Sequence, residues 1–205
     1  MIQKRLHDYD QSLSVWKNKT ALKMLEAVNR KDAQMWRSYS EQLSKGLRHS
    51  LEHTDLGHVF NQLLQEQVDL ISSLSVESAQ RVIDYHDRAR EVYITGGRAN
   101  EFAEEILKTG DVAASRAKLI ARTEISRSGA ILTQARAESI GSVGYIWRIS
   151  GQNTRPSHQK MEGVFVYWNR PPTFIEGKYK KTSMTYHAGC GPNCMCWQEV
   201  VIPED

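Results

Sequence analysis

The sequence predicts an α+β protein in which a mostly helical N-terminal region is joined by one long helix to a small antiparallel β-containing C-terminal domain. Apolar residues recur at spacings of three and four over the first two thirds of the chain, as in amphipathic helices. After residue 143 the spacing changes to two, as in half-buried strands. Glycines stand at this change, at Gly141 and Gly144. We therefore divide the chain into a helical region, 1–111, and a C-terminal domain, 112–205.

The composition is that of an ordinary soluble protein. The chain has 205 residues, of which 25% are charged and 40% hydrophobic, so it can bury a core without relying on disulfides or metal. It contains no apolar run of roughly 18 residues that would span a bilayer, and its N-terminus lacks the apolar segment of a secretory signal. We therefore expect no membrane partner, and folding in a reducing cytoplasm, where cysteines are usually free or metal-bound.

Apolar stripes define the predicted helices of the N-terminal region. The stripes are Leu13, Trp16, Thr20, Met24, Val28, then Trp36, Tyr39, Leu43, Leu47, Leu51, then Leu56, Val59, Phe60, Leu63, Leu64, Val68, Ile71 and Leu74. A polar run, 29–32, separates the first two. Ser75 is a suitable N-cap for a further helix, which Gly96 and Gly97 would end. Because each helix has one apolar stripe, each must pack on a neighbour.

The long helix is predicted over 112–140. A short helix over 99–108 precedes it and is expected to stop at Gly110, and Gly141 is expected to close the long helix. A polar stretch rich in glycine then leads into the β domain, 141–205.

Three segments of the β domain are rich in β-branched and aromatic residues and are predicted to be strands: 145–149, 164–168 and 197–202. The stretch between the second and third strands contains two adjacent prolines and several lysines and is predicted to be irregular. Loops of this length are usually functional or held by something else in the structure.

The net charge of +3 argues against a dedicated DNA-coating protein. Two local basic clusters can nevertheless contact double-stranded DNA non-specifically through its phosphates. They are Lys178, Lys180, Lys181 and Arg116, Lys118, Arg122, Arg127, Arg136. The interpretation we favour is a solvated helix face and a lysine-rich loop.

All three cysteines lie close together, at Cys190, Cys194 and Cys196. Thiolates on one tetrahedral zinc must converge, each about 2.3 Å from the metal, and a loop rich in Gly and Pro can bring them together. The spacing is not that of a standard zinc knuckle, so a fourth ligand must come from elsewhere. His158 is the first candidate and His187 the alternative. A structural zinc site is our leading hypothesis, and a disulfide within the loop and free packed thiols stay open.

No catalytic residue is predicted, and we expect that the chain is not an enzyme. A nucleobase deaminase needs His-x-Glu followed by Pro-Cys-x-x-Cys, but neither His158 nor His187 has a glutamate two residues further on. A cysteine hydrolase needs one activated cysteine with a histidine base, and three neighbouring cysteines would oxidise one another. The sequence also lacks P-loop, dinucleotide-binding and HExxH motifs.

Four short motifs follow one another between residues 116 and 202. They are Ala121-Arg122-Thr123-Glu124 on the long helix, Trp147-Arg148-Ile149-Ser150-Gly151 with the later Arg155-Pro156-Ser157-His158, Gly163 before Val164-Phe165-Val166, and Asn193-Cys194-Met195-Cys196. In this order they resemble the Mu F-like head morphogenesis family of bacteriophages, in which the first and last motifs read ARTE and NCRC. The chain departs from that pattern at Asn153, where relatives usually have Asp, and at Met195, where they usually have Arg.

The resemblance implies roles for several of these residues. Some relatives carry a Cys-x-x-Cys pair in place of the Arg-Pro-Ser-His segment, which implies a metal-ligand position at His158; a structural histidine is the alternative. We expect Arg122 or Glu124 to make a charge-assisted contact that holds the β domain on the long helix, with a catalytic Glu124 as the alternative. Arg155 and Gly163 complete the set of structural motif residues.

The resemblance also implies a function. The chain would be a minor capsid protein of a tailed bacteriophage, of low copy number, located in the virion at the capsid interior or portal vertex and assembled in the bacterial host cytoplasm. It would contact the portal protein and the major capsid and scaffold proteins, and assist procapsid assembly, DNA packaging or DNA delivery. Candidate docking anchors are Trp16, Trp36 and Tyr39, although we favour core positions for them. A nucleic-acid-binding accessory protein and an enzyme or toxin domain related to the same module are the alternatives.

Overall fold

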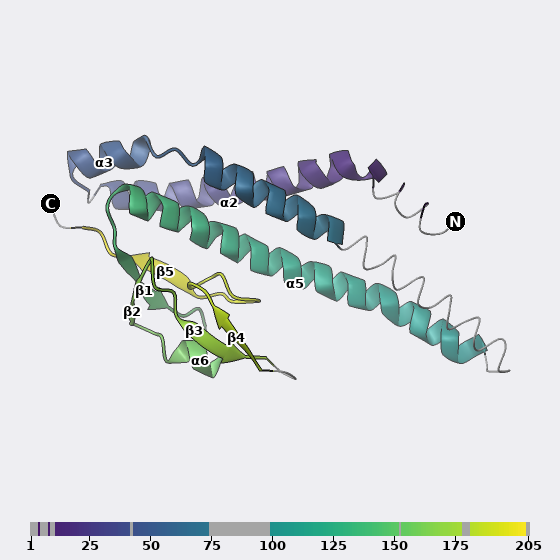
Figure 1. The fold of residues 1–205 in the computed structure, drawn as a ribbon. Coiled ribbons are helices and arrows are strands. Elements are labelled where there is room, and N and C mark those ends of the chain that lie inside the picture. Colours follow the sequence, from purple (N-terminus) through teal and green to yellow (C-terminus); the bar gives the residue numbers. More distant parts are fainter. Residues whose placement is uncertain are drawn as a thin grey trace. The chain divides into compact units, whose positions relative to one another are not determined.

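The computed structural model describes residues 4, 8, 11–41, 43–73, 99–151, 153–177 and 181–203. The elements in chain order are α2 (Ser14–Ser40), α3 (Lys45–Glu52), a helix over 57–73, α5 (Ala99–Ser139), β1 (Gly144–Arg148), α6 (Pro156–Gln159), β2 (Phe165–Tyr167), β3 (Thr173–Glu176), β4 (Thr182–Thr185) and β5 (Trp197–Val200). Long helices precede small antiparallel sheets (Figure 1), which confirms the predicted α+β class. The helix predicted to begin at Ser75 lies outside the described residues.

The chain forms two compact units. One comprises Met1–Lys23 and Leu64–Ala121, and its described residues are mainly helical. The other comprises Met24–Leu63 and Arg122–Asp205, and it contains both sheets and every site residue predicted from the sequence. Among the described helices, none combines the length and apolar character that crossing a bilayer requires.

Helix α2 runs without interruption through the polar run 29–32, so the predicted separation of two helices there is wrong. Two polar side chains of this run, those of Asn29 and Asp32, interact with α5 in the second unit. Asp32 is 4% exposed and forms an ion pair with Arg136 of α5, and its other oxygen accepts a hydrogen bond from Thr133 Oγ1 at 2.5 Å. Arg136 also donates to Asn29 Oδ1 at 2.8 Å. Polar interactions between α2 and α5 thus stand where a break between two helices was expected.

Helix α5 is continuous from Ala99 to Ser139, so the predicted stop at Gly110 is also wrong. A single glycine inside a helix costs about 1 kcal/mol relative to alanine, which a long helix tolerates. The predicted end of the helix is confirmed. Gly141 has φ 80°, and the N–H of Ser142 donates to the carbonyl of Ala137 at 3.0 Å, as in a Schellman motif.

The three predicted strands are confirmed as β1, β2 and β5, which form one antiparallel sheet in the order β2-β1-β5. The prediction of an irregular stretch between β2 and β5 is wrong, because β3 and β4 form a second antiparallel pair in which Phe174 lies opposite Met184. Both strands of this pair have only 4 residues and are largely polar, so their pattern was too short to detect.

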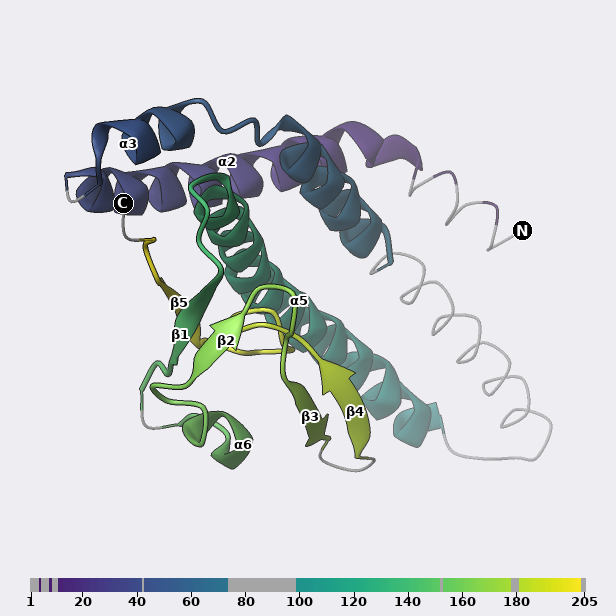
Figure 2. The same ribbon diagram turned by 60° about the vertical axis from the view of Figure 1, so that its left-hand side comes forward.

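The core of the second unit lies where the β2-β1-β5 sheet meets the C-terminal half of α5 (Figures 1 and 2). Tyr145 and Trp147, alternate residues of β1, are fully buried, and each contributes about 2 to 3 kcal/mol by leaving water. The core position expected for Trp36 is confirmed at 2% exposure, whereas Trp16 is 55% exposed. The buried cluster comprises Trp36, Leu43, Ala137, Ile140, Tyr145, Trp147, Val166, Trp168, Phe174, Ala188, Cys194 and Cys196.

Candidate metal centre

His158, Cys194 and Cys196 converge in the interior of the second unit. All three residues are buried, and their potential ligand atoms lie within 4.8 Å of one another. Nδ1 of His158 is 3.6 Å from the sulfur of Cys194 and 3.4 Å from that of Cys196. The cysteine loop that precedes β5 therefore folds back on the turn that carries His158, as the sequence predicts.

Local sequence explains how these side chains meet. Arg155 is extended, with φ −57° and ψ 145°, and Pro156 starts the single turn of α6 that carries His158 into the interior. In the cysteine loop, Gly189 has φ 84°, and a Cβ on it would lie 3.2 Å from the carbonyl oxygen of Cys196. The loop therefore needs glycine at this position in order to fold onto itself.

The second ring nitrogen of His158 is held from the opposite side. Nε2 lies 2.9 Å from the hydroxyl of Tyr186, and that hydroxyl donates to Glu176 at 2.7 Å. Since the tyrosine proton is directed at the carboxylate, we infer that Nε2–H donates to Tyr186 and that Nδ1 presents its lone pair to the two sulfurs. Histidines that bind metals commonly donate their other ring N–H in this way, which orients the ring.

Glu176 is the centre of this supporting network. Its carboxylate accepts a hydrogen bond from Ser157 Oγ at 2.5 Å and forms an ion pair with Arg155. Burial acts to raise the pKa of Glu176, but the hydrogen bonds from Ser157 and Tyr186 and the charge of Arg155 hold that pKa below its usual value. Arg155 also donates to the carbonyl of Pro192 and so ties the network to the cysteine loop. The carboxylate is therefore ionised at neutral pH.

The two buried thiols act as a pair. The side-chain hydrogen bond from Cys196, supported by the backbone N–H groups of Cys196 and Gly189, lowers the pKa of Cys194, although burial acts to raise it. The same bond and burial raise the pKa of Cys196. The lowered pKa favours the thiolate form of Cys194, and the second sulfur would lose its proton when a cation binds.

The three residues fit a zinc ion. With zinc–sulfur bonds of about 2.3 Å and a zinc–nitrogen bond of about 2.1 Å, tetrahedral geometry separates nitrogen from sulfur by roughly 3.6 Å. The distances of 3.4 and 3.6 Å from His158 to the two sulfurs agree with this value. Two thiolates and one imidazole are also a donor set that selects zinc over calcium or magnesium.

The other two predicted ligands lie elsewhere. Cys190 does not belong to the convergent group, and burial raises the pKa of its thiol to about 11, as expected for a thiol that packs. Both ring nitrogens of His187 are occupied, with Nε2 3.0 Å from the carbonyl of Trp168 and Nδ1 3.2 Å from the hydroxyl of Tyr145. All three cysteines are free thiols, so the structure does not contain the alternative disulfide.

The contact between the cysteine loop and α5 involves a residue that the sequence reasoning did not single out. The N–H of Asn193 donates to Thr123 Oγ1 at 2.9 Å, inside the Ala-Arg-Thr-Glu motif. Glu124 is 8% exposed and pairs with Arg127 of its own helix at 3.3 Å, whereas Arg122 is exposed. A neutral hydroxyl thus makes one hydrogen bond between the loop and α5, and the charge-assisted contact expected of Arg122 or Glu124 stays a prediction.

Two residues of the supporting network, Glu176 and Tyr186, were also missed. Both belong to the stretch predicted to be irregular, which in fact holds the β3–β4 pair. One signal could have found them: a long loop is usually functional or fixed by contacts with the rest of the protein, and this stretch contains a glutamate and a tyrosine that can make such contacts. Gly163, in contrast, lies where the motif places it, with its N–H donating to the carbonyl of Trp147 at 2.9 Å before β2 begins.

Comparisons with known proteins place the chain in a family. A family model described as Phage Mu protein F like protein matches residues 85–199. A Haemophilus influenzae protein described as an uncharacterized protein is 30% identical over 162 residues, which cover 78% of this chain and 32% of that protein. The chain thus spans about a third of the length of this relative. No solved structure matches this chain. The chain belongs to the Phage Mu protein F like family, a bacteriophage family, as the motifs on α5, at His158 and in the cysteine loop predict.

Proposed function

We propose that the chain is a minor head protein of a tailed bacteriophage, present in low copy number in the virion and associated with the portal. In this role it contacts the portal, major capsid and scaffold proteins and assists procapsid assembly, DNA packaging or DNA delivery. The observation that carries the proposal is the family match, because residues 85–199 include the C-terminal half of α5, His158 and the cysteine loop together.

We further propose that His158, Cys194 and Cys196 hold one structural zinc ion. When bound, the ion joins α6 to the cysteine loop, two segments more than thirty residues apart in sequence. All three ligand residues are buried, so a bound ion would be shielded from a substrate in solution. Because a structural zinc has four ligands, a fourth ligand would complete the site. We propose that this role is not enzymatic.

The structure gives less support to the alternative of a nucleic-acid-binding accessory protein. Arg136, one of the residues in the predicted basic cluster, is 8% exposed and paired with Asp32, so it does not contribute to a basic surface. Lys178 and Lys180 lie outside the described residues, as do the side chains of Arg116 and Lys118.

The portal proposal is tested by co-purification with the portal protein of the phage or prophage that encodes the chain. We expect a stable complex at low stoichiometry, because a minor head protein acts at one vertex. Size-exclusion chromatography with light scattering gives the ratio. The proposal is contradicted if no complex forms while the purified chain shows hydrolytic or transferase activity, or tight duplex DNA binding that falls steeply with salt.

The zinc proposal predicts that Glu176→Gln weakens metal binding without unfolding the protein. The substitution keeps the size of the side chain but removes the charge that fixes Tyr186 and His158, so the affinity for zinc should fall about 10- to 100-fold. Competition with a chromophoric chelator measures the affinity, and circular dichroism checks the fold. Glu26→Gln, at an exposed position of α2, is the matched control and should change nothing. Equal affinities for the two variants would show that the network does not serve a metal.

A further inference from the structure

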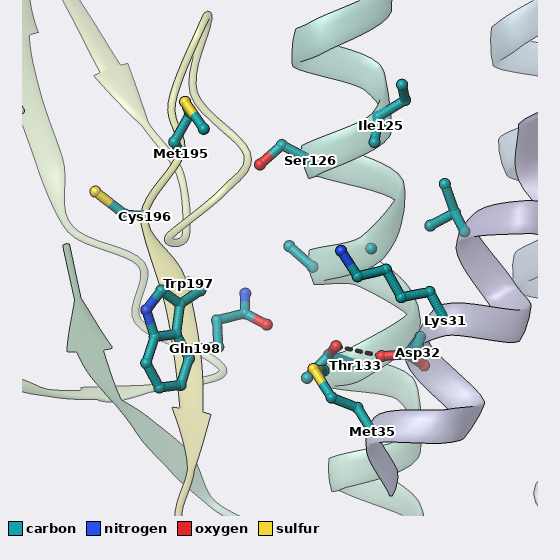
Figure 3. Close-up of a pocket in the computed structure, with 13 residues that line it drawn as sticks. Lys31, Asp32, Met35, Ile125, Ser126, Thr133, Met195, Cys196, Trp197 and Gln198 are labelled. Atoms are coloured by element: carbon teal, nitrogen blue, oxygen red, sulfur yellow. Dashed lines mark hydrogen bonds between the residues drawn. The ribbon is translucent and has the colours of Figure 1, made fainter. Parts of the chain in front are cut away.

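A groove of about 300 Å³ lies in the second unit, between α2, α5 and the segment that runs from the cysteine loop into β5 (Figure 3). Much of its lining is apolar and open to solvent. Met35 is 45% exposed, Ile125 48%, Met195 71% and Trp197 46%. These four residues come from three separate elements, so their apolar side chains form one surface rather than scattered exposed positions.

The lining of the groove includes a buried hydrogen-bond acceptor that is unsatisfied among the described residues. Gln198 is 6% exposed, and its Nε2 donates to the carbonyl of Ala188 at 3.2 Å, which sets the orientation of the amide. Its Oε1 accepts no hydrogen bond from any residue that the structure describes. Figure 3 shows the Gln198 side chain extending from β5 on the side of α5. Because buried acceptors are nearly always satisfied, this oxygen indicates a place for a donor from another molecule.

A positive charge stands at the same groove. Lys31 is exposed, and Figure 3 shows its side chain extending from α2 toward the space between α5 and β5. The adjacent Asp32 does not neutralise it, since that carboxylate is already engaged by Arg136 and Thr133. The ammonium of Lys31 forms no ion pair with another described residue, so it is available to a carboxylate.

We propose that the groove docks a segment of a partner protein that presents a tryptophan side chain beside an acidic residue. The indole ring would lie against Met35, Ile125, Met195 and Trp197, its N–H would donate to Gln198 Oε1, and the neighbouring carboxylate would pair with Lys31. A volume of about 300 Å³ suits one large side chain and is small for a cofactor. This inference rests on the proposed function in that a head protein supplies the segment.

The candidate metal centre and the groove share one stretch of chain. Exposure alternates along it, with Cys194 and Cys196 buried and Met195 and Trp197 exposed. Cys194 and Cys196 thus belong to the candidate metal centre, and their neighbours Met195 and Trp197 line the groove, which Cys196 also borders. A bound ion would hold this loop in the conformation that presents Met195 and Trp197.

The test uses the full chain and three small probes: acetyl-Asp-Trp-amide, acetyl-Lys-Trp-amide and acetyl-Asp-Ala-amide. Chemical shifts of the isotope-labelled protein are followed during titration. We expect acetyl-Asp-Trp-amide to shift signals of the groove residues, including the side-chain amide of Gln198. Reversing the charge of the probe should weaken binding about tenfold, and removing the indole should abolish it.

Two variants at exposed lysines sharpen the result. Lys31→Glu should reverse the preference between the Asp and Lys probes, whereas Lys45→Glu, at an exposed position of α3, should leave it unchanged. No shifts, shifts at another surface, or a preference that Lys31→Glu does not alter would overturn the proposal. So would a concentration-dependent dimer that covers the groove, because the occupant would then be a second copy of the chain.

The portal experiment separates this inference from the proposed function. Probe binding with no portal complex would count against the function and leave the groove intact. A portal complex that survives Lys31→Glu, together with a groove that binds no probe, would overturn the docking site and leave the function standing.

Discussion

Replacing Cys194 by serine is expected to abolish stoichiometric zinc binding and to loosen residues 150–202 while the helices of α2 and α3 persist. The substitution removes one of the three potential ligands and the thiol whose pKa is lowered. An ion present at about 1,000 times its dissociation constant stabilises the folded state by about 4 kcal/mol. That is a large part of the 5 to 15 kcal/mol of a typical domain. Elemental analysis measures the zinc, and hydrogen exchange locates the loosened segment.

Cys190→Ser is the matched control, because it removes a thiol of the same loop that lies outside the convergent group. This variant should retain one zinc per chain and the exchange protection of the β domain. If Cys194→Ser and Cys190→Ser behave alike, and zinc is absent from the unmodified chain as well, the loop is held by packing.

Arg136→Met is expected to destabilise the second unit by about 3 to 5 kcal/mol. The substitution fills most of the space of the arginine but leaves the carboxylate of Asp32 buried without its cation. Both side chains are almost fully buried, at 9% and 3% exposure, so solvent cannot replace the lost partner. The loss should appear as a lower midpoint in urea unfolding, followed by the fluorescence of the buried tryptophans.

The double variant Asp32→Leu with Arg136→Met tests the reason for that loss. When both charges are removed, no ion remains buried alone, so most of the stability should return. Arg37→Met, at an exposed position of α2, is the control and should have an effect within about 0.5 kcal/mol. If the double variant is as unstable as the sum of the two single variants, the ion pair is not the cause.

Much of the fold could be predicted because its signals are local. The change from helical to strand spacing marked the fold class, and Gly141 marked the end of α5 at a left-handed position. The failures have causes that a local sequence pattern does not show. The polar run around Asp32 looked like a break between helices because its partner, Arg136, lies more than a hundred residues away in sequence. Gly110 looked like the end of a helix because glycine disfavours helix by about 1 kcal/mol relative to alanine. The sequence pattern does not show that the long helix on both sides of it tolerates this cost.

Part of the candidate metal centre could also be predicted from local sequence signals. Clustered cysteines are visible in a sequence, and the motif at His158 pointed to the histidine that meets them. The conformation of the cysteine loop is not visible in the sequence. Cys190 was therefore included among the predicted ligands, although its sulfur does not lie with those of Cys194 and Cys196. Glu176 and Tyr186 belong to strands and turns too short to predict, and their role becomes evident only when the hydrogen bonds to His158 are seen.

X-ray absorption at the zinc edge of the purified full chain tests most directly whether a metal holds the cysteine loop on the His158 turn. The account predicts one zinc per chain with two sulfur neighbours at about 2.3 Å and imidazole nitrogen at about 2.0 to 2.1 Å. A chain that carries no zinc after expression with the metal, or a zinc surrounded by oxygen and nitrogen without sulfur, would contradict it.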